Sequence, residues 1–281
     1  VAEPGGTAKM SKRKLDKYLK QKDFASLFAV GQTVAERTAI TVDKETFNPV
    51  IVDFYRAIGF LPDAILNYLL LLGWSLDDST EDFTRQQMIE SFSLARVTKS
   101  PASFDPQKLV AFQSRWMHRL PLEQKVEMCW PYLVSAGWVE SAQDVSQSAQ
   151  YTRVKQVVAA ADDRIKLAGD ILEFDDFFVG DSDLQFDSAA FDKRLKQDPG
   201  AVALLRQFRE RLSELDEFTA ASTEACLKQF VETQGIKFNQ IIHALRVSVT
   251  GKGVGFGMFD TLAILGQSHA LARIDRGLSL L

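Results

Sequence analysis

The sequence is poor in cysteine and histidine, and both shortages restrict its chemistry. Its 281 residues include two cysteines, Cys129 and Cys226, and three histidines. The two cysteines stand far apart, each within an apolar helical pattern, so the sequence offers no disulfide framework and no Cys/His cluster for zinc. We therefore expect no metal site and a reduced, cytoplasmic compartment.

Excess basic charge and long apolar runs are also missing. The 33 Lys and Arg stand against 37 Asp and Glu, for a net charge of −4, so nucleic-acid binding requires local basic patches. The longest apolar run, residues 61–74, contains Asp63 and Asn67 and is too short to span a bilayer. Residues 1–20 hold no apolar signal-peptide core. We expect no membrane partner and, because the chain starts at Val1, a piece of a longer gene product.

Apolar residues recur at helical spacing through most of the chain, which predicts an almost entirely helical fold. Asp105 and Pro106 form an N-cap and first-turn pair, and glycines stand where helices should stop. One stretch alternates instead, residues 49–54, and predicts a short strand or extended link. Other helices are predicted from residue 61 to 72, at 122–136, 146–161, 200–215, 222–234, 238–249, 258–265 and 268–279.

Charge is distributed unevenly. Residues 9–22 hold seven basic residues and one acid, whereas residues 169–187 hold seven acids and no base. Four phenylalanines are interleaved with those acids. We interpret the acidic run as a solvated loop, and a role as an interaction segment stays open.

The clearest chemical motif is the run Lys9-Met10-Ser11-Lys12-Arg13, which follows Gly5 and Gly6. Backbone amides and a hydroxyl can donate to a polyphosphate there, and the cations can neutralise departing pyrophosphate. Mobile glycines upstream would let such a loop close on ATP and reopen. Taken alone, the run is equally typical of a nuclear-localisation-like patch or an exposed helix start.

The run matches the second signature of class I aminoacyl-tRNA synthetases, and the rest of the chain resembles one member, the bacterial-type glutamyl-tRNA synthetases. Several motifs in the same order carry the resemblance as far as the C-terminus. They are residues 50–55, 59–75, 92–97, 101–109, 245–251 and 265–266.

The resemblance implies a mainly α architecture. Residues 1–48 would be the tail of the catalytic domain with the signature loop and an insertion, and residues 49–120 a helical stem-contact domain. Residues 121–198 and 199–281 would form two subdomains of an all-helical anticodon-binding domain. Related glutaminyl enzymes end in β-barrels, and the C-terminal part of this sequence shows no strand alternation.

The resemblance also implies an activity, that of glutamate–tRNA ligase, which activates glutamate with ATP and transfers it to tRNA(Glu). Lys9 and Lys12 would stabilise pyrophosphate, with Lys9, Ser11 and Lys12 as the catalytic group. Met10 and Arg13 would complete the contacts to the ATP phosphates. ATP with Mg²⁺ would be the cofactor of the full-length enzyme.

The other ATP motif of the family, an HIGH-like sequence, is missing together with the strand-rich half that binds glutamate and ATP. This chain should therefore not aminoacylate by itself, and we expect it to hold no cofactor. Residues 15–48 have no counterpart in typical members, and we interpret them as a local structural insert.

For the anticodon, Arg164 aligns with an arginine that reads the third base in discriminating members of the family. A guanidinium suits the acceptors of a cytosine or a nearby phosphate. A salt bridge with Asp162 or Asp163 is the alternative.

Arg246 aligns with a second contact on the anticodon side, beside the glycine-rich loop 251–258. In that loop Lys252 can meet phosphate, Gly255 permits close backbone approach, and Phe256 can stack on a base. Met258 completes the predicted site. An ordinary glycine-rich helix connector is the alternative.

The partners implied are tRNA(Glu) directly, and glutamate and ATP through the missing N-terminal half of a monomeric enzyme. One alternative is a stand-alone RNA-binding or interaction module derived from a synthetase, without catalysis. Another is a non-discriminating enzyme that also charges glutamine tRNA.

Overall fold

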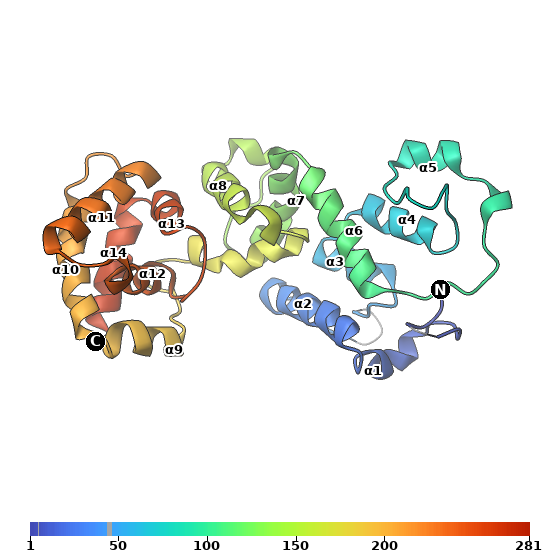
Figure 1. Ribbon diagram of the computed structural model, residues 1–281, viewed down its shortest axis with the longest axis horizontal. Coiled ribbons are helices and arrows are strands. Elements are labelled where there is room, and N and C mark those ends of the chain that lie inside the picture. Colours follow the sequence, from blue (N-terminus) through green and yellow to red (C-terminus); the bar gives the residue numbers. More distant parts are fainter. Residues whose placement is uncertain (5, 44–46) are drawn as a thin grey trace. The chain divides into compact units, whose positions relative to one another are not determined.

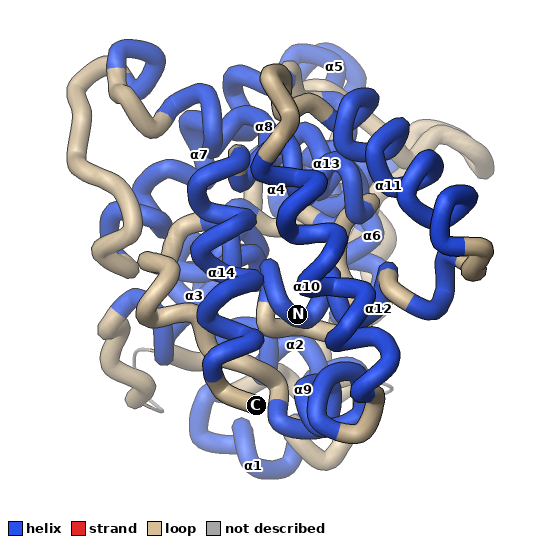
Figure 2. Tube along the Cα trace, turned by 90° about the vertical axis from the view of Figure 1, so that its left-hand side faces the viewer, coloured by secondary structure: helices blue, strands red, loops and turns tan. Residues whose placement is uncertain are grey.

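The chain folds as helices joined by turns and loops. The computed structural model describes residues 1–4, 6–43 and 47–281, and the helices are labelled in Figure 1. These residues form fourteen α-helices and no β-strand, and their only β pairing is three isolated bridges (Figure 2). The predicted mainly α fold class is confirmed.

Two compact units make up the chain, Val1–Glu173 (unit 1) and Phe174–Leu281 (unit 2). The finer boundaries predicted after residues 48, 120 and 198 stay predictions. None of the helices in the described residues combines the length and the apolar character needed to cross a membrane.

Unit 1 contains eight α-helices and several single turns of 3-10 helix. Four of these turns lie wholly within the unit, at Lys12–Lys14, Leu94–Arg96, Val145–Gln147 and Asp162–Arg164. A longer 3-10 segment with a kink at Phe174, Ala168–Phe177, leads from unit 1 into unit 2. The α-helices are α1 (Leu15–Tyr18), α2 (Lys22–Thr38), α3 (Val52–Ile58), α4 (Pro62–Leu71), α5 (Arg85–Ser91), α6 (Pro106–Arg119), α7 (Leu122–Ser135) and α8 (Tyr151–Ala161).

The core of unit 1 is built around α6, which packs on α4 and α2. The side chain of Gln113 is fully buried in α6. Its Oε1 accepts the N–H of Leu61 at 2.8 Å, and its Nε2 donates to the carbonyl of Lys166 at 2.8 Å. A buried amide with both ends satisfied fixes its partners in one arrangement. Gln113 therefore holds the start of α4 and the turn at residue 166 against α6.

The insertion at residues 15–48, which we interpret as a local structural insert, contributes to the core of unit 1. It contains the 17-residue helix α2, which was not among the predicted helices. Phe24, Leu27 and Val34 are buried on its inner face, and α2 packs on α3, α6 and α7. The apolar spacing of three and four residues along α2 is the signal that could have identified it. Residues 44–46 of the insertion lie outside the described residues.

Of the two alternatives predicted for residues 49–54, a short strand or an extended link, the strand is wrong. Pro49 and Val50 form a turn, Ile51 is extended, and α3 begins at Val52. The inner face of α3 is then formed by Phe54, which is fully buried. The short alternating run therefore marks the extended approach to a helix N-terminus, which resembles a strand over two or three residues.

Unit 2 contains six α-helices, with a π-helical turn at Asp192–Lys196 and a 3-10 turn at Phe238–Gln240. Here α10 packs on α11 and α14, and α12 packs on α14. Leu205, Phe208, Leu245 and Ile274 are fully buried in this core. The helices are α9 (Ser188–Phe191), α10 (Pro199–Ser213), α11 (Ala220–Gln234), α12 (Ile242–Thr250), α13 (Met258–Leu265) and α14 (Gln267–Ser279).

Two glycines that follow helices in unit 1 allow a direct test of its packing. Gly59 (φ +94°) and Gly137 (φ +73°) both have left-handed backbones, but only a Cβ on Gly59 would meet another atom, the backbone nitrogen of Ala168 at 2.7 Å. We expect Gly59→Ala to lower the free energy of unfolding by about 3 kcal/mol and Gly137→Ala by about 1 kcal/mol, from backbone strain alone. Denaturant unfolding followed by tryptophan fluorescence measures both, because all four tryptophans lie in unit 1. Equal losses would contradict the close approach at Gly59.

Candidate nucleic-acid interface

The signature loop, residues 9–13, is fixed at its base by backbone pairing. The N–H of Ala2 donates to the carbonyl of Ala102 at 2.9 Å, and the N–H of Phe104 donates to the carbonyl of Ala2 at 3.1 Å. The N–H of Met10 donates to the carbonyl of Val1 at 3.1 Å. The loop therefore starts from a small paired platform on the segment that precedes α6.

Glu3 anchors the downstream side of this loop. Its side chain is nearly buried, and its two carboxylate oxygens accept from Lys14 Nζ at 2.6 Å and Lys17 Nζ at 2.5 Å. Hydrogen bonds from these two ammonium groups lower the pKa of Glu3 to about 2. Tyr18 adds a contact by accepting the N–H of Ser11 at 3.0 Å.

The predicted phosphate contacts surround this anchor. Lys9, Lys12 and Arg13 are exposed, and Met10 and Ser11 are half-buried. The carbonyl of Lys12 accepts from Asn48 at 3.0 Å, so the insertion also supports the loop. Gly5, one of the two upstream glycines, lies outside the described residues. The arrangement presents several cations on a braced loop, which suits an anionic ligand.

Arg164 ends a single 3-10 turn, Asp162–Arg164, and is exposed. The carboxylate of Asp163 lies 2.9 Å from His118 Nδ1 on α6. Asp162 has a positive φ of 46°, which makes the chain turn sharply after α8. These exposed His118, Asp162 and Asp163 side chains are also the one group in the described ranges that could approach a metal ion. The turn leaves Arg164 exposed on the surface of unit 1.

In unit 2 the structure brings Arg246 to the glycine-rich loop. Arg246 lies on α12, and its Nη1 donates to the carbonyl of Phe256 at 2.7 Å. A Cβ added to Gly255 would lie 3.4 Å from the same Nη1. The predicted contacts Arg246, Gly255 and Phe256 are therefore neighbours in space.

Lys252 is engaged by two carboxylates of its own unit. Its Nζ lies 2.5 Å from Asp175 and 2.6 Å from Asp176. Burial raises the pKa of Asp176, although Lys252 opposes this shift, and the two acids raise the pKa of Lys252 against the effect of its own burial. Lys252 thus ties the loop to the acidic segment, and its predicted contact with phosphate stays a prediction.

Phe256 and Met258 are buried, 4% and 5% exposed. The Phe256 ring stacks on Phe174 with centroids 4.9 Å apart and on Phe177 with centroids 5.1 Å apart. The ring that was predicted to stack on a base thus has aromatic partners within unit 2. The exposed residues of the loop are three glycines, Gly253, Gly255 and Gly257, and Val254, which is 81% exposed. Val254 was not among the predicted site residues.

The acidic run is not the solvated loop that its composition indicated. Arg273 on α14 is 2% exposed and donates to the carbonyls of Asp176, Val249 and Val179 and to the carboxylate of Asp181. A buried guanidinium needs such acceptors for its N–H groups. Arg273 therefore holds the acidic segment against α12 and α14.

Gly251 allows the acidic segment to lie close to the glycine-rich loop. Its φ is +72°, and a Cβ there would lie only 2.0 Å from the carbonyl oxygen of Gln185. The N–H of Asp187 donates to the carbonyl of Gly251 at 2.8 Å. Only glycine allows the acidic segment to approach the loop this closely.

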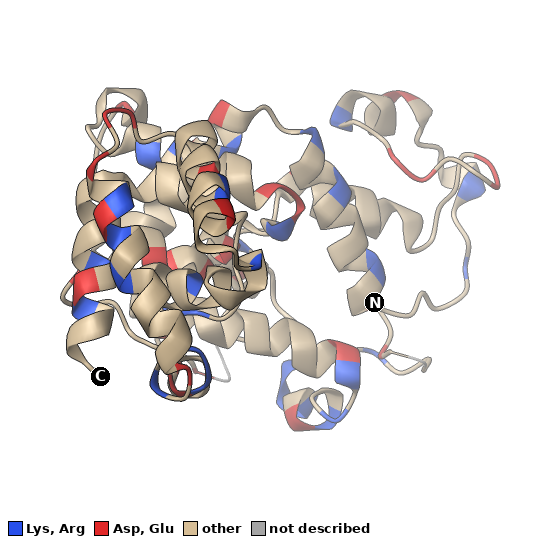
Figure 3. Cartoon of the chain, turned by 60° about the vertical axis from the view of Figure 1, so that its left-hand side comes forward, with Lys and Arg blue, Asp and Glu red and all other residues tan. Residues whose placement is uncertain are grey.

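Basic and acidic positions are interspersed along the helices, as Figure 3 shows. This agrees with the net charge of −4 and with the absence of a global positive field. Binding of a polyanion must therefore depend on local groups such as the signature loop and the turn at Arg164.

The anchor at Glu3 predicts a pH dependence of the signature loop. Because its pKa lies below the ordinary value of 4.5, its stabilising effect is full above that pH and is lost as the pH falls toward about 2. We expect the protection factor of the Met10 amide, which is the ratio of its intrinsic to its observed exchange rate, to fall over this range, and Glu3→Gln to give low protection at neutral pH as well. Exchange at Met10 that the variant leaves unchanged at neutral pH would contradict the anchor.

The ion pairs of Lys252 predict a large effect in unit 2. Lys252→Gln would leave the buried Asp176 without its counter-charge, and we expect a loss of about 2–3 kcal/mol in the free energy of unfolding. Lys228→Gln is the matched control, because Lys228 makes an exposed helical pair with Glu224, and should cost less than about 0.5 kcal/mol. Hydrogen exchange of the α12 amides measures the loss in both variants. Similar losses would contradict a larger stabilising effect of the Lys252 pairs than of an exposed pair.

Two protein families match this chain. The family described as "Anticodon binding domain" matches residues 124–278, more than half of the chain. The family described as "tRNA synthetases class I (E and Q), catalytic domain" matches residues 36–111.

Curated relatives and a solved structure agree with these matches. The chain is 34% identical over 225 residues to the glutamate–tRNA ligase of Moorella thermoacetica, covering 80% of this chain and 45% of the relative. It is 36% identical over 223 residues to the glutamate–tRNA ligase of Roseiflexus castenholzii, covering 79% of this chain and 43% of that relative.

A solved glutamate tRNA ligase from Elizabethkingia meningosepticum shares the fold over 100% of this chain and 50% of its own, with a TM-score of 0.76 at 23% identity. The chain spans about half the length of the curated relatives that it matches. On these matches, the chain belongs to the family described as "Anticodon binding domain", and it is similar to glutamate–tRNA ligases over about 80% of its length.

Proposed function

We propose that this chain is the tRNA-binding part of an enzyme that activates glutamate with ATP and transfers it to tRNA(Glu). The observation that carries the proposal is the anticodon-binding match over residues 124–278, which includes both Arg164 and Arg246. The relatives named glutamate–tRNA ligase support it over most of the chain. The enzyme would work as a cytoplasmic monomer.

Arg164 is the proposed reader of the third anticodon base. It is exposed at the end of a sharp turn, so a splayed-out base could reach its guanidinium. Single-stranded bases are commonly recognised by such contacts to their edges. Arg246 and the exposed backbone of Gly253–Gly255 would form a second contact to the anticodon.

The proposed site still includes Lys252, Phe256 and Met258. The contacts of Lys252 and Phe256 suggest how they would act. Lys252 is paired with two acids and Phe256 is packed on two phenylalanines. In this arrangement they would contribute by holding the loop in shape. Direct contact with phosphate or base would need these side chains to leave their present partners.

The signature loop would serve the ATP chemistry. Lys9 and Lys12 would neutralise charge on departing pyrophosphate, with Ser11, Met10 and Arg13 completing the contacts to the phosphates of ATP·Mg²⁺. Glutamate and the rest of ATP would be bound by a partner half of the enzyme. The braced position of the loop beside Glu3 supports this role.

Binding to a glutamate tRNA transcript tests the proposal. A second transcript carries G in place of C at the third anticodon base. We expect the unaltered chain to prefer C by about 1–3 kcal/mol, the range of one good base contact. Arg164→Gln should abolish that preference, because it removes the guanidinium that donates to the base.

Arg56→Gln is the control, since Arg56 is also exposed in unit 1 but lies on α3. It should leave the preference intact. Failure of the unaltered chain to bind either transcript would contradict the proposed function. Binding without a preference would remove Arg164 from the site and favour an enzyme that does not discriminate between tRNAs.

A further inference from the structure

A basic cleft lies in unit 1 at the C-terminal end of α6. It has a volume of about 590 Å³ and is lined by Ser114, Arg115, His118, Arg119, Asp163 and Lys166. Its lining includes three side chains that are always positive and one carboxylate. None of the roles described above uses the cleft's three cations, Arg115, Arg119 and Lys166.

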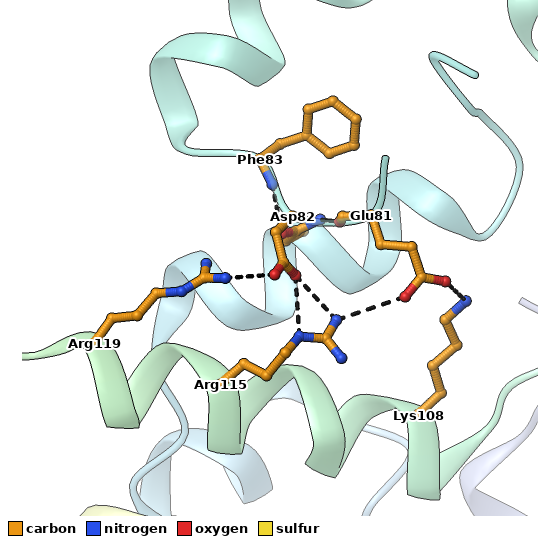
Figure 4. A network of polar contacts seen from close by, with 7 residues as sticks. Glu81, Asp82, Phe83, Lys108, Arg115 and Arg119 are labelled. Atoms are coloured by element: carbon orange, nitrogen blue, oxygen red, sulfur yellow. Dashed lines mark hydrogen bonds and ion pairs between the residues drawn. The ribbon is translucent and has the colours of Figure 1, made fainter. Parts of the chain in front are cut away.

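The two arginines are held in place by a carboxylate behind them. Arg115 donates to Asp82 Oδ1 through Nε at 3.1 Å and through Nη2 at 3.0 Å, and Arg119 Nη2 donates to Asp82 Oδ2. Figure 4 shows both side chains reaching from α6 to Asp82. Partial burial raises the pKa of Asp82, but the hydrogen bonds from Arg119 and Arg115 lower it below its ordinary value. Asp82 therefore stays ionised and keeps both guanidinium groups oriented.

Asp82 is itself positioned by buried groups. The side chain of Asn67 on α4 is fully buried and bonds to the backbone on each side of Asp82, through Glu81 O at 2.7 Å and Phe83 N at 2.9 Å. The Arg115 guanidinium also lies over the Phe112 ring, 4.3 Å from its centroid. The cleft is therefore pre-organised, which lowers the entropy lost on binding.

Hydrogen-bond donors remain within this arrangement. Across the described part of the chain, no residue accepts from Arg115 Nη1, from Arg119 Nε or Nη1, or from Lys166 Nζ. The backbone of Lys166 is fixed by Gln113 and by Asp170, which accepts its N–H at 2.8 Å. Two oriented guanidinium groups and one lysine ammonium, all with spare N–H groups around one cleft, suit a tetrahedral oxyanion, which arginine can bind through two donors.

We infer that this cleft binds a backbone phosphate of the tRNA, an inference that rests on the proposed function. Asp163 and Lys166, which line the cleft, flank Arg164 in sequence, so the phosphate would lie close to the base that Arg164 reads. Arg115, Arg119 and His118 are 39%, 51% and 65% exposed, which leaves room for a polymer. Phosphate contacts fix the register of a nucleic acid, and base contacts read it.

The test compares two double variants of the whole chain. Arg119→Gln with Lys166→Gln removes two cations from the cleft. Arg85→Gln with Lys228→Gln removes two cations elsewhere, from exposed pairs with Asp63 and Glu224.

Affinity for the glutamate tRNA transcript is measured over a series of salt concentrations. We expect the cleft variant to bind both anticodon sequences more weakly, and by the same factor. Its slope of log affinity against log salt should be smaller by about 1 for each phosphate that the variant no longer neutralises. The control variant should keep the slope of the unaltered chain, and thermal unfolding checks that both variants are folded.

A titration with inorganic pyrophosphate separates the two proposals. The protein is isotope-labelled, and the amide signals of residues 114–119 and 163–166 are followed. Shifts in the unaltered chain but not in the cleft variant, together with the slope change, support the cleft as a phosphate site. Pyrophosphate binding without tRNA binding would contradict both the proposed function and the inference that the cleft binds a tRNA phosphate. The cleft would then be a site for small anions only. Normal tRNA binding with an unchanged slope would overturn the cleft and leave the proposed function standing.

Discussion

The candidate anticodon loop depends on one buried charge, the guanidinium of Arg273. It binds three backbone carbonyls and Asp181, and so holds a chain segment with many acids in a compact unit. That segment then supplies the carboxylates that bind Lys252 and the rings that cover Phe256. A buried charge without these acceptors would strongly destabilise the fold, so the geometry of the loop follows from satisfying Arg273.

In unit 1, too, charged side chains hold segments and side chains in place, but there the central groups are carboxylates and their partners are cations. There a few well-placed carboxylates hold groups of cations: Asp82 binds Arg115 and Arg119, and Glu3 binds Lys14 and Lys17. This gives an acidic protein local basic surfaces of fixed shape. Such surfaces are what a chain with a net charge of −4 needs to bind RNA selectively, because attraction over the whole molecule is absent.

The sequence was informative where structure is local. The helices that were predicted from residue 106 onward begin and end within about five residues of the observed ones, since caps, prolines and apolar spacing lie within each segment. Helix α9 was not predicted. The burial of Phe256 was not predictable, because its partners Phe174 and Phe177 are distant in sequence. Helix α2 was missed although its apolar spacing was present. The roles of Asp82 and Arg273 depend on tertiary contacts between distant segments, which no local pattern reveals.

The central claim is that this chain contacts tRNA through the turn at residues 162–166, the C-terminal end of α6 and the loop at residues 251–257. Hydrogen–deuterium exchange of the chain, with and without a glutamate tRNA transcript, tests it most directly. The account predicts slower exchange in these three segments and unchanged exchange in α11, which contributes to none of these sites. Unchanged exchange in all three segments, or protection confined to α11, would contradict it.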